Sequence, residues 1–545
     1  MSPARRGYRR ETILTVKEAY LKQNVLVEPL FNQWYAWMGL IAPATAALYI
    51  ANSHLKIMQS FVSAPQIHIS ALRNPHMRGG PFISLDASAV DCIKALMEKT
   101  RKEQAHMLKL AEDIKTLEGM LENEATGHSL ESLYDAVPEG LKGYVELVYD
   151  LNNHPSIRLI EGLLYKSPYY NESSQSVALS TVDDDYRPFV FSTPRLKSED
   201  RVHLDTPFAC SALDELFRMK FKARPIESIK EALNLNGDSG GLFSAFFTNT
   251  PPARPPVYEG DLVRVRYFGH ATLLVEYRGL SLLTDPVISY DHGKGIDRYT
   301  YADLPDYIDY VLITHTHQDH CMLETLLQLR HKIRNLIVPK SNSGTVIDPS
   351  IKLALKQMGF SNVLEIDEME ALKIEGGTIT GLPFIGEHAD LSIRTKIAYL
   401  INLSGRSMLC AADSNNIEPI MYRHIHESTG DIDAIFLGME CDGAPMSWIY
   451  GSLLTKSLTR KQDQSRRLNG SDYERAISLV EELKPKSVYV YAMGQEPWLA
   501  FVTSIGYTEE SRPIVESDRL VEECKSRGIE SERLFGQKEI FLPSF

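Results

Sequence analysis

The feature that most constrains the fold is a cluster of metal-binding residue types directly after a predicted strand. Residues 310–313 form a short β-branched and aliphatic run, typical of a buried strand, and His315, His317, Asp319 and His320 follow it. In an extended segment, His315 and His317 point the same way and can hold one metal ion, while Asp319 and His320 can hold a second. Imidazole suits Zn, Fe, Cu and Ni, and an added carboxylate suits harder ions such as Fe or Mn. The pattern predicts a binuclear metal site without choosing the metal.

The size and charge of the chain restrict its class. With 545 residues it is too long for one hydrophobic core, so we expect two or three domains. The net charge of −13 argues against a nucleic-acid-binding protein, which needs a basic face. The six cysteines show no paired spacing, which fits reduced thiols better than disulfides. No apolar run closely follows the basic residues 1–10, so we expect no secretory signal and a cytoplasmic protein.

Helical patterns dominate the first half of the chain. Residues 34–51 are apolar enough to suggest a membrane span, but Pro43 interrupts them and no Lys/Arg cluster flanks them. We therefore expect two buried helices that meet near Pro43, and no membrane association. Residues 107–121 carry apolar side chains at spacings of three and four, which predicts an amphipathic helix packed on its own domain or on a second subunit. We also expect helix over residues 129–165 and 214–235, and short strands over residues 176–180 and 188–191.

A proline-rich segment, residues 246–259, is too stiff for a helix or a central strand and marks a domain boundary. We therefore expect a mostly helical α+β domain over residues 1–245, the linker, and a second domain over residues 260–545. The second domain is rich in strands with helices between them, and its helix before the last strand begins with a capping box of Ser471 and Glu474. This order implies helices that cover stacked sheets, an αββα layering within the α/β class.

Three short motifs of the second domain together resemble the metallo-β-lactamase fold. They are Gly269-His270-Ala271, Thr284-Asp285-Pro286 and His315-x-His317-x-Asp319-His320. The resemblance implies that Asp285 orients a ligand without binding the metal itself. It also implies a bridging carboxylate after residues 408–410, where Asp413 is available.

The remaining ligands bear on the choice between hydrolase and oxidoreductase. After residues 380–385 the sequence offers both Glu387 and His388, and since neighbours on an extended loop face opposite ways, only one of them serves. A zinc hydrolase would use the histidine. The histidine that usually follows the last strand is missing after residues 488–491, which leaves one metal under-coordinated by protein. An open position beside carboxylates suits the binding of dioxygen.

More closely, nearly the whole chain resembles the CmlA-type diiron β-hydroxylases of nonribosomal peptide pathways. The N-terminal stretches that carry this resemblance, which ordinary zinc hydrolases lack, are residues 40–47 (LIAPATAA), 63–66 (SAPQ) and 77–82 (MRGGPF). The resemblance implies that His315, His317 and Glu387 bind one iron ion, that Asp319 and His320 bind the other, and that Asp413 bridges them. It maps a further carboxylate near the cluster onto Glu440, for which a solvated strand-end carboxylate is the alternative interpretation.

The resemblance implies a dioxygen-dependent monooxygenase that β-hydroxylates an amino acid held as a thioester on the thiolation (carrier) domain of a synthetase. Its cofactor would be an oxo- or hydroxo-bridged pair of iron ions. No flavin or Fe–S motif is visible, so a separate reductase or ferredoxin has to supply two electrons. The resemblance also implies that the N-terminal domain, residues 1–245, forms a homodimer and helps to dock the carrier domain.

Two alternatives remain open at this point. One is a dinuclear zinc hydrolase, a thioesterase or lactonase, which would prefer His388 as a ligand. The other is a catalytically silent scaffold that docks synthetase modules. The aromatic residues Trp448, Tyr450 and Trp498 are given no role, since scattered aromatic side chains are more often part of a core.

Overall fold

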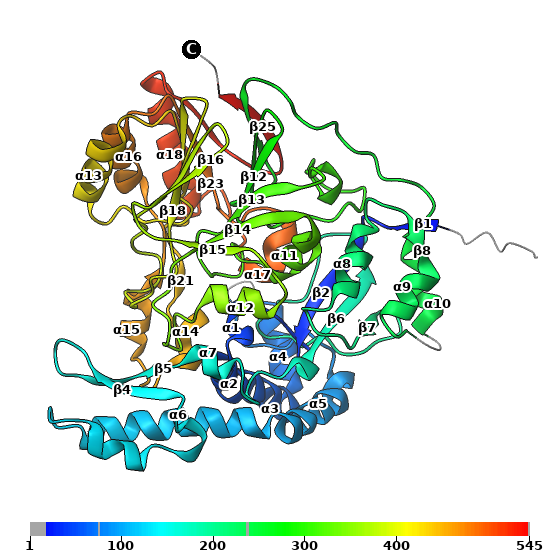
Figure 1. Cartoon of the computed structure of the whole chain (residues 1–545), viewed down its shortest axis with the longest axis vertical. Helices are drawn as coiled ribbons and strands as arrows, with labels where there is room; N and C mark the ends of the chain where they lie inside the picture. Colours follow the sequence, from blue (N-terminus) through cyan, green and yellow to red (C-terminus); the bar gives the residue numbers. More distant parts are fainter. Residues whose placement is uncertain (1–17, 75–76, 236–238, 543–545) are drawn as a thin grey trace, which may run out of the picture.

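Two seven-stranded sheets stack face to face in the second half of the chain (Figure 1). The computed structural model describes residues 18–74, 77–235 and 239–542, so the basic stretch 1–10 lies outside the described residues. The first sheet has the order β15 (Val363–Ile366), β14 (Ile333–Pro339), β13 (Ile308–Leu312), β12 (Leu280–Thr284), β11 (Leu273–Tyr277), β10 (Val263–Tyr267) and β25 (Lys538–Leu542). The second has the order β16 (Ala371–Ile374), β17 (Gly377–Leu382), β18 (Ala398–Leu403), β19 (Arg406–Cys410), β20 (Ala434–Gly438), β23 (Ser487–Tyr491) and β24 (Glu530–Arg533).

Apolar side chains on the facing surfaces explain how the two sheets pack. Val265, Val275 and Leu282 of the first sheet share one buried cluster with Ile401 and Phe436 of the second, because residues two apart on a strand face the same side. Helices α11 (Leu323–Leu329) and α12 (Ile351–Gln357) pack on the outer face of the first sheet. Helices α13 (Pro419–Thr429), α16 (Tyr473–Leu483) and α18 (Arg512–Ser526) pack on the second. The predicted αββα layering is confirmed.

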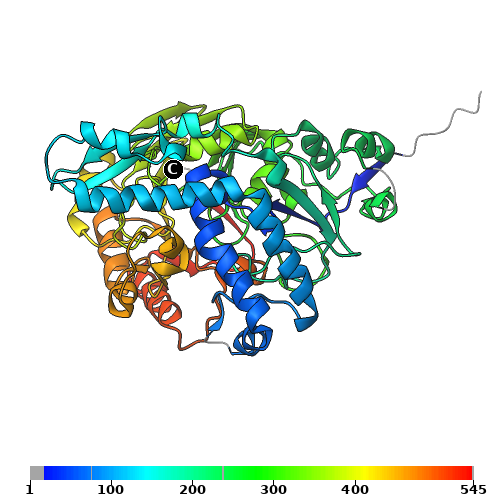
Figure 2. The same cartoon turned by 90° about the horizontal axis from the view of Figure 1, so that it is seen from below.

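The first half of the chain builds helices around a small antiparallel sheet. This sheet has the order β3 (Trp34–Tyr35), β2 (Val25–Phe31), β6 (Gln175–Thr181) and β7 (Val202–Leu204). The helices are α1 (Met38–Ile41), α2 (Pro43–Tyr49), a π-helical turn (Ile50–His54), α3 (Leu55–Ser63), α4 (Pro65–Leu72), α5 (Val90–Glu103) and α6 (Ala105–Glu124). In the view from below, α3, α5 and the long α6 lie in front, toward the viewer (Figure 2). The two helices expected near Pro43 are present, and nowhere in the described chain does a helix combine the length and apolar character needed to cross a membrane.

The apolar seam predicted over residues 107–121 is buried within the same chain. Met107, Leu110, Ile114, Leu117 and Leu121 of α6 all belong to the large apolar cluster of the N-terminal half. The sequence left open whether this helix packs on its own domain or on a second subunit. The structure shows that it packs on its own domain.

Some predicted elements were wrong. Residues 129–165 contain a hairpin of β4 (Val145–Tyr149) and β5 (Pro155–Leu159), because Val145, Leu147, Ile157 and Leu159 alternate with exposed residues at the period of a strand. Residues 188–191 form no strand, and the rings of Phe189 and Phe191 both pack against Trp448. The helix expected over residues 214–235 is split into α8 (Ser211–Arg218) and α9 (Ile226–Ala232) around the short strand β8 (Arg224–Pro225). Proline disfavours helical backbone at the preceding residue, here Arg224.

The two halves share one apolar core. Leu326 of α11 and Leu355 of α12 belong to the same buried cluster as Leu40 of α1 and Leu216 of α8. The first residues of the proline-rich segment are also folded, because β9 (Phe247–Thr248) pairs with β1 (Glu18–Leu21). Residues 249–262 contain neither helix nor strand.

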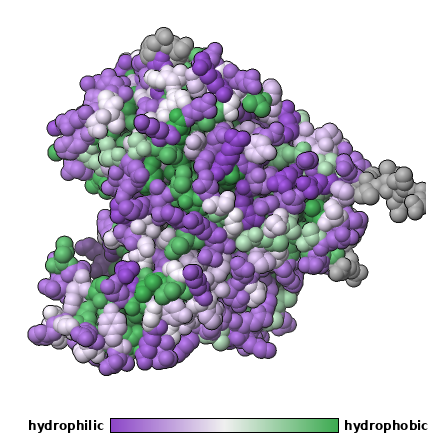
Figure 3. All heavy atoms as spheres, viewed as in Figure 1, coloured by the Kyte–Doolittle hydropathy of each residue, from purple (hydrophilic) through white to green (hydrophobic). Residues whose placement is uncertain are grey.

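The molecular surface in Figure 3 is mostly hydrophilic. It has a notch on its left side, between the part that contains α13 and α16 and the part that contains α6.

Candidate metal centre

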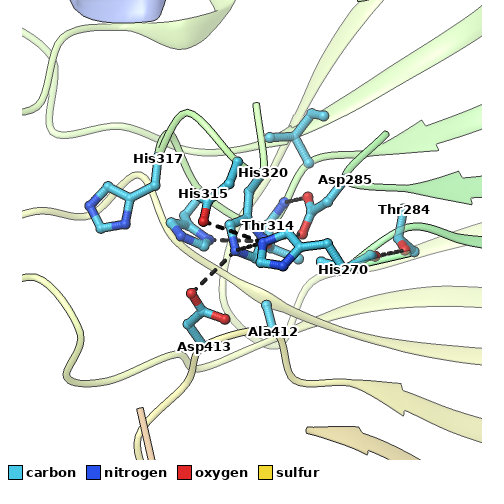
Figure 4. A network of polar contacts seen from close by, with 12 residues as sticks. His270, Thr284, Asp285, Thr314, His315, His317, His320, Ala412 and Asp413 are labelled. Carbon is cyan, nitrogen blue, oxygen red and sulfur yellow. Dashed lines mark hydrogen bonds and ion pairs between the residues drawn. The ribbon is translucent and has the colours of Figure 1, made fainter. Parts of the chain in front are cut away.

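The candidate ligands lie on loops at the ends of strands from both sheets. Asp285 follows β12, the segment 315–320 follows β13, Glu387 follows β17 and Asp413 follows β19. His270 lies in the turn between β10 and β11. In Figure 4, the rings of His270, His315 and His320 gather between Asp285 and Asp413, and His317 stands further out. The strands thus bring together residues that are far apart in the sequence.

Three groups of these side chains are close enough to hold metal ions. In each group, one nitrogen or oxygen atom per side chain lies within 4.8 Å of the others. His315 belongs to two of the groups and His320 to two, so the metal positions that the groups define are adjacent. The groups are His315, His317 and Glu387; His315, His320 and Asp413; and His270, Asp319 and His320.

Several atoms of these groups lack a partner in the protein. Nε2 of His315 and Oδ1 of Asp413 are buried and form no hydrogen bond with any described residue. Buried polar atoms without partners are costly, and a metal ion would satisfy them. Burial, together with His320 and His317, lowers the pKa of His315 well below its ordinary value and keeps the ring in the neutral form that binds metal. The residues therefore fit a pair of metal ions.

Asp285 holds the loop that carries the histidines. Its Oδ1 accepts a hydrogen bond of 2.7 Å from the backbone N–H of Thr314, and its Oδ2 accepts one of 2.5 Å from the Thr314 hydroxyl. The same Oδ2 lies 2.9 Å from Nδ1 of His320. Asp285 has no exposed surface. A carboxylate in this position fixes the orientation of His320 and leaves its Nε2 free to face the metal site.

Glu387 and His388 are placed differently. Oε1 of Glu387 lies 2.8 Å from Nδ1 of His317, whereas His388 belongs to none of the three groups and stacks on the His317 ring at 4.6 Å. Burial alone would raise the pKa of Glu387, but His317 and His388 outweigh it and lower the pKa to about 2. The backbone of Glu387 is left-handed, with φ of 62°, in the loop that places the carboxylate beside His317.

Left-handed backbone recurs around the site. Such conformations cost on the order of 1–3 kcal/mol each for residues other than glycine, and they persist where the surrounding fold imposes them. The non-glycine residues with positive φ at the site are His270 (51°), Asp285 (33°), Glu387 (62°), Ala412 (46°) and Ala492 (53°). Each lies where a strand passes into a loop, so the fold holds the site in a shape that the local sequence does not favour.

His270 was missed as a site residue in the sequence analysis. Its Nε2 lies 3.4 Å from Oδ2 of Asp319 and 3.2 Å from Nε2 of His320. The loop after the last strand holds it there, because Ala492 N–H donates to the His270 carbonyl at 3.0 Å and Gly494 N–H donates to Nδ1 at 3.2 Å. No histidine follows β23, but His270 supplies an imidazole beside Asp319 and His320. The only signal in the sequence was the Gly-His-Ala motif itself.

A cavity of about 290 Å³ leads to the centre. His317, Asp319, Glu387 and Asp413 line it together with Glu440. Oε1 of Glu440 accepts hydrogen bonds from the backbone N–H groups of residues 442 and 443, and Oε2 accepts one from the Tyr507 hydroxyl. Glu440 is therefore held in place beside the centre, unlike a freely solvated carboxylate.

Two of the three aromatic residues that were given no role lie at the site. Trp448 lines the cavity, and the Tyr450 hydroxyl lies 3.0 Å from Nε2 of His317. Trp498 packs against the glycine that precedes His270, since a side chain at Gly269 would lie 2.5 Å from its ring. Nothing in the local sequence distinguished these rings from core residues.

An αββα sandwich with adjacent candidate metal-binding groups at the ends of its strands has the metallo-β-lactamase fold. The beta-lactamase superfamily domain matches residues 264–410, and the diiron non-heme beta-hydroxylase N-terminal domain matches residues 20–251. A relative from Streptomyces venezuelae, the 4-amino-L-phenylalanyl-[CmlP-peptidyl-carrier-protein] 3-hydroxylase, is 39% identical over 529 residues, which cover 96% of this chain and 99% of the relative. The chain therefore belongs to the CmlA-type diiron β-hydroxylases.

Solved structures agree with this membership. The crystal structure of CmlA, a diiron beta-hydroxylase from Streptomyces venezuelae, matches with a TM-score of 0.91 and 38% identity and covers 96% of this chain and 99% of that one. A mutant of CmlA matches with a TM-score of 0.89 and 37% identity, over 96% of this chain and all of the other. The likeness extends over both halves of the molecule.

Proposed function

We propose that the protein is a dioxygen-dependent diiron monooxygenase that β-hydroxylates an amino acid held as a thioester on the thiolation domain of a nonribosomal peptide synthetase. The observation that carries the proposal is the buried carboxylate of Glu387 beside His315 and His317, where a zinc hydrolase would place a histidine. Carboxylate-rich donor sets suit iron. The Streptomyces venezuelae relative, which matches from end to end, is named for hydroxylation of an aminoacyl group on a peptidyl carrier protein.

The contacts support a specific assignment of ligands. In this assignment, one iron ion is held by His315, His317 and Glu387, the other by Asp319 and His320, and Asp413 bridges the two. We add His270 to the second ion because it contacts both Asp319 and His320. His315 belongs to the groups of both Glu387 and Asp413, which is the arrangement expected for neighbouring ions.

Iron bound here supplies the redox chemistry with dioxygen. Hydroxylation of one C–H bond by dioxygen consumes two electrons and two protons and yields the alcohol and water. The protein's own contribution is to fix the ligands and to keep them out of bulk water. Asp285 orients His320, and the cavity presents the substrate to the centre. We assign Glu440 to the catalytic machinery, as a carboxylate held beside the centre by the Tyr507 hydroxyl, which donates a hydrogen bond to its Oε2.

The proposal requires partners. The substrate arrives on a carrier domain, and a separate reductase or ferredoxin supplies the electrons, since the sequence contains no flavin or Fe–S motif. The family resemblance further suggests that residues 1–245 dock the carrier domain and pair two chains into a homodimer. We place this reaction in the cytoplasm, within nonribosomal peptide antibiotic biosynthesis.

The first test is the metal itself. Protein grown without added zinc is analysed for metal content, and an iron-57-enriched sample is examined by Mössbauer spectroscopy. We expect about two iron ions per chain in a coupled diferric pair. Carrier domains loaded with different amino acids are then incubated with dioxygen and reductant, and gain of one oxygen atom is followed by mass spectrometry. Two zinc ions together with thioester cleavage would instead establish the hydrolase.

A further inference from the structure

Residues 77–82, one of the N-terminal motifs noted in the sequence, lie at the mouth of the cavity that leads to the metal centre. Arg78 and Gly79 line this cavity together with Asp319 and Glu387. Glu387 is only 5% exposed, whereas Arg78 is exposed. The metal ligands therefore form the inner end of the cavity and the motif forms its outer end. The volume of about 290 Å³ is at the lower end of the range of small-molecule sites.

Specific contacts hold the motif at the mouth. The indole Nε1 of Trp448 donates a hydrogen bond of 2.9 Å to the carbonyl of Gly79. Gly79 has φ of 72°, and a side chain there would lie 3.3 Å from the indole nitrogen, so this approach requires glycine. The Arg78 guanidinium lies over the backbone of Gly506, where a Cβ atom would be 2.8 Å from Nη1. The rim of the cavity thus presents a positioned cation.

The charges along the cavity are separated. Among its described lining residues, Arg78 is the only lysine or arginine, while the carboxylates are Asp319, Glu387, Asp413 and Glu440. No residue in the described part of the chain forms an ion pair with Arg78. Apolar side chains such as Trp448 and Val502, and the hydroxyls of Thr503 and Ser504, line the cavity as well. A matching ligand has an anion at the mouth, apolar and amide groups beyond it, and a reacting group near the metal ions.

We propose that Arg78 binds the phosphate of the 4′-phosphopantetheine arm that carries the aminoacyl thioester. This inference rests on the proposed function, because a carrier domain holds its amino acid on such an arm. From the carrier outward, the arm consists of a phosphodiester, a dimethyl carbon, two amides and the thioester, which is the order of chemistry from the mouth of the cavity to its inner end. The arginine fork suits phosphate oxygens better than lysine does. Arg78 is thus a binding residue for the arm of the substrate.

A titration of the full-length enzyme tests this directly. Calorimetry compares 4′-phosphopantetheine with pantetheine, which has a hydroxyl in place of the phosphate. We expect the native enzyme to bind the phosphorylated arm about tenfold more tightly. Arg78→Ala should bind both compounds equally, and Arg78→Lys should show an intermediate preference. Arg73→Ala, which removes an exposed arginine of the same region, is the matched control and should keep the native preference. The inference is wrong if the native enzyme shows no preference, or if Arg78→Ala retains it.

Turnover separates this inference from the proposed function. With an aminoacyl carrier domain, Arg78→Ala should raise KM about tenfold, whereas with an aminoacyl-pantetheine thioester it should match the native enzyme. Equal KM values on the carrier domain would overturn the role of Arg78 and leave the hydroxylase intact. A native enzyme that hydroxylates neither substrate would overturn the hydroxylase, and the titration would still decide whether Arg78 binds the phosphate. Inorganic phosphate that displaces the arm at equal affinity would show a general anion site and contradict the inference.

Discussion

Glu387 and His388 are adjacent in sequence, but only Glu387 shares a ligand group with His315 and His317. We expect Glu387→Ala to weaken iron binding at least about tenfold, since loss of even a supporting carboxylate has an effect of this size. His388→Ala should keep two iron ions, because its ring stacks on His317 without joining a ligand group. The iron content per chain, measured by emission spectroscopy, and the Mössbauer spectrum distinguish the Glu387 variant from the His388 variant. Loss of iron from the His388 variant alone would reverse the assignment.

His270 provides a second test at the scale of single residues. His270→Ala should release iron from the side of Asp319 and His320, because these two side chains lie 3.4 Å and 3.2 Å from its Nε2. We expect close to one iron ion per chain and loss of the coupled spectrum. His424→Ala, at an exposed histidine on α13, is the control and should keep two. A coupled pair that survives in the His270 variant would remove it from the ligand set.

His54, far from the site in the sequence, makes stability depend on pH. It is buried against Trp34, with ring centroids 4.0 Å apart, and burial lowers its pKa from 6.5 to about 3. Between these two values the unfolded chain binds a proton that the folded chain does not, so stability falls as the pH drops from 6.5 toward 3. One such residue contributes up to about 1.4 kcal/mol per pH unit. His54→Phe should reduce the loss of urea stability between pH 7 and pH 5, and an unchanged loss would contradict this account.

At the scale of elements, strands and helices with a regular apolar period were predicted well, and irregular ones were not. The start of α16 illustrates the limit. The sequence suggested Ser471 with Glu474 as the capping pair, but the cap is Asp472, whose side chain accepts a hydrogen bond from Arg475 N–H. Ser471 instead accepts a hydrogen bond from the backbone N–H of Asn416, a partner that lies on another loop. Both serine and aspartate cap helices well, so local preference could not choose between adjacent positions.

The observed cap gives a test for α16. Asp472→Ala should destabilise the first turn by about 1 kcal/mol and speed its amide hydrogen exchange about fivefold. Glu474→Ala should have little effect, since that side chain is exposed and only pairs with Arg519 at 3.1 Å. Arg512→Ala controls for the ion pair that Asp472 also makes at 3.2 Å. Faster exchange in the Glu474 variant than in the Asp472 variant would restore the original capping box.

At the scale of the whole molecule, a buried ionic network joins the two halves. Arg187 contacts Glu28 of the N-terminal sheet at 2.8 Å and Glu324 of α11 at 2.7 Å, and all three side chains are at most 8% exposed. The hydroxyls of Tyr35 and Tyr290 also donate to Glu324. This network and the shared apolar core join the sheet of the first half to the first layer of the metal-binding sandwich.

Removing the centre of this network should destabilise the protein strongly. Arg187→Ala leaves Glu324 buried without its cation, while Glu28 keeps Arg195 at 2.9 Å. We expect a loss of about 3–5 kcal/mol. Arg334→Ala breaks the more exposed pair with Asp309 at 2.7 Å and should cost at most about 1 kcal/mol. Urea unfolding followed by circular dichroism measures both. Similar losses in the two variants would show that the network does not hold the halves together.

The sequence by itself determined the strand-rich sandwich and the local cluster from His315 to His320, because periodicity and short-range spacing are encoded by neighbouring residues. The tertiary structure decided that Glu387, at a position with left-handed backbone, shares a ligand group with His315 and His317, whereas His388 does not. It also brought in His270 through the loop after β23, and it placed Arg78 and Tyr450 at the site. These placements depend on how distant loops pack, and residue spacing carries no information about that packing.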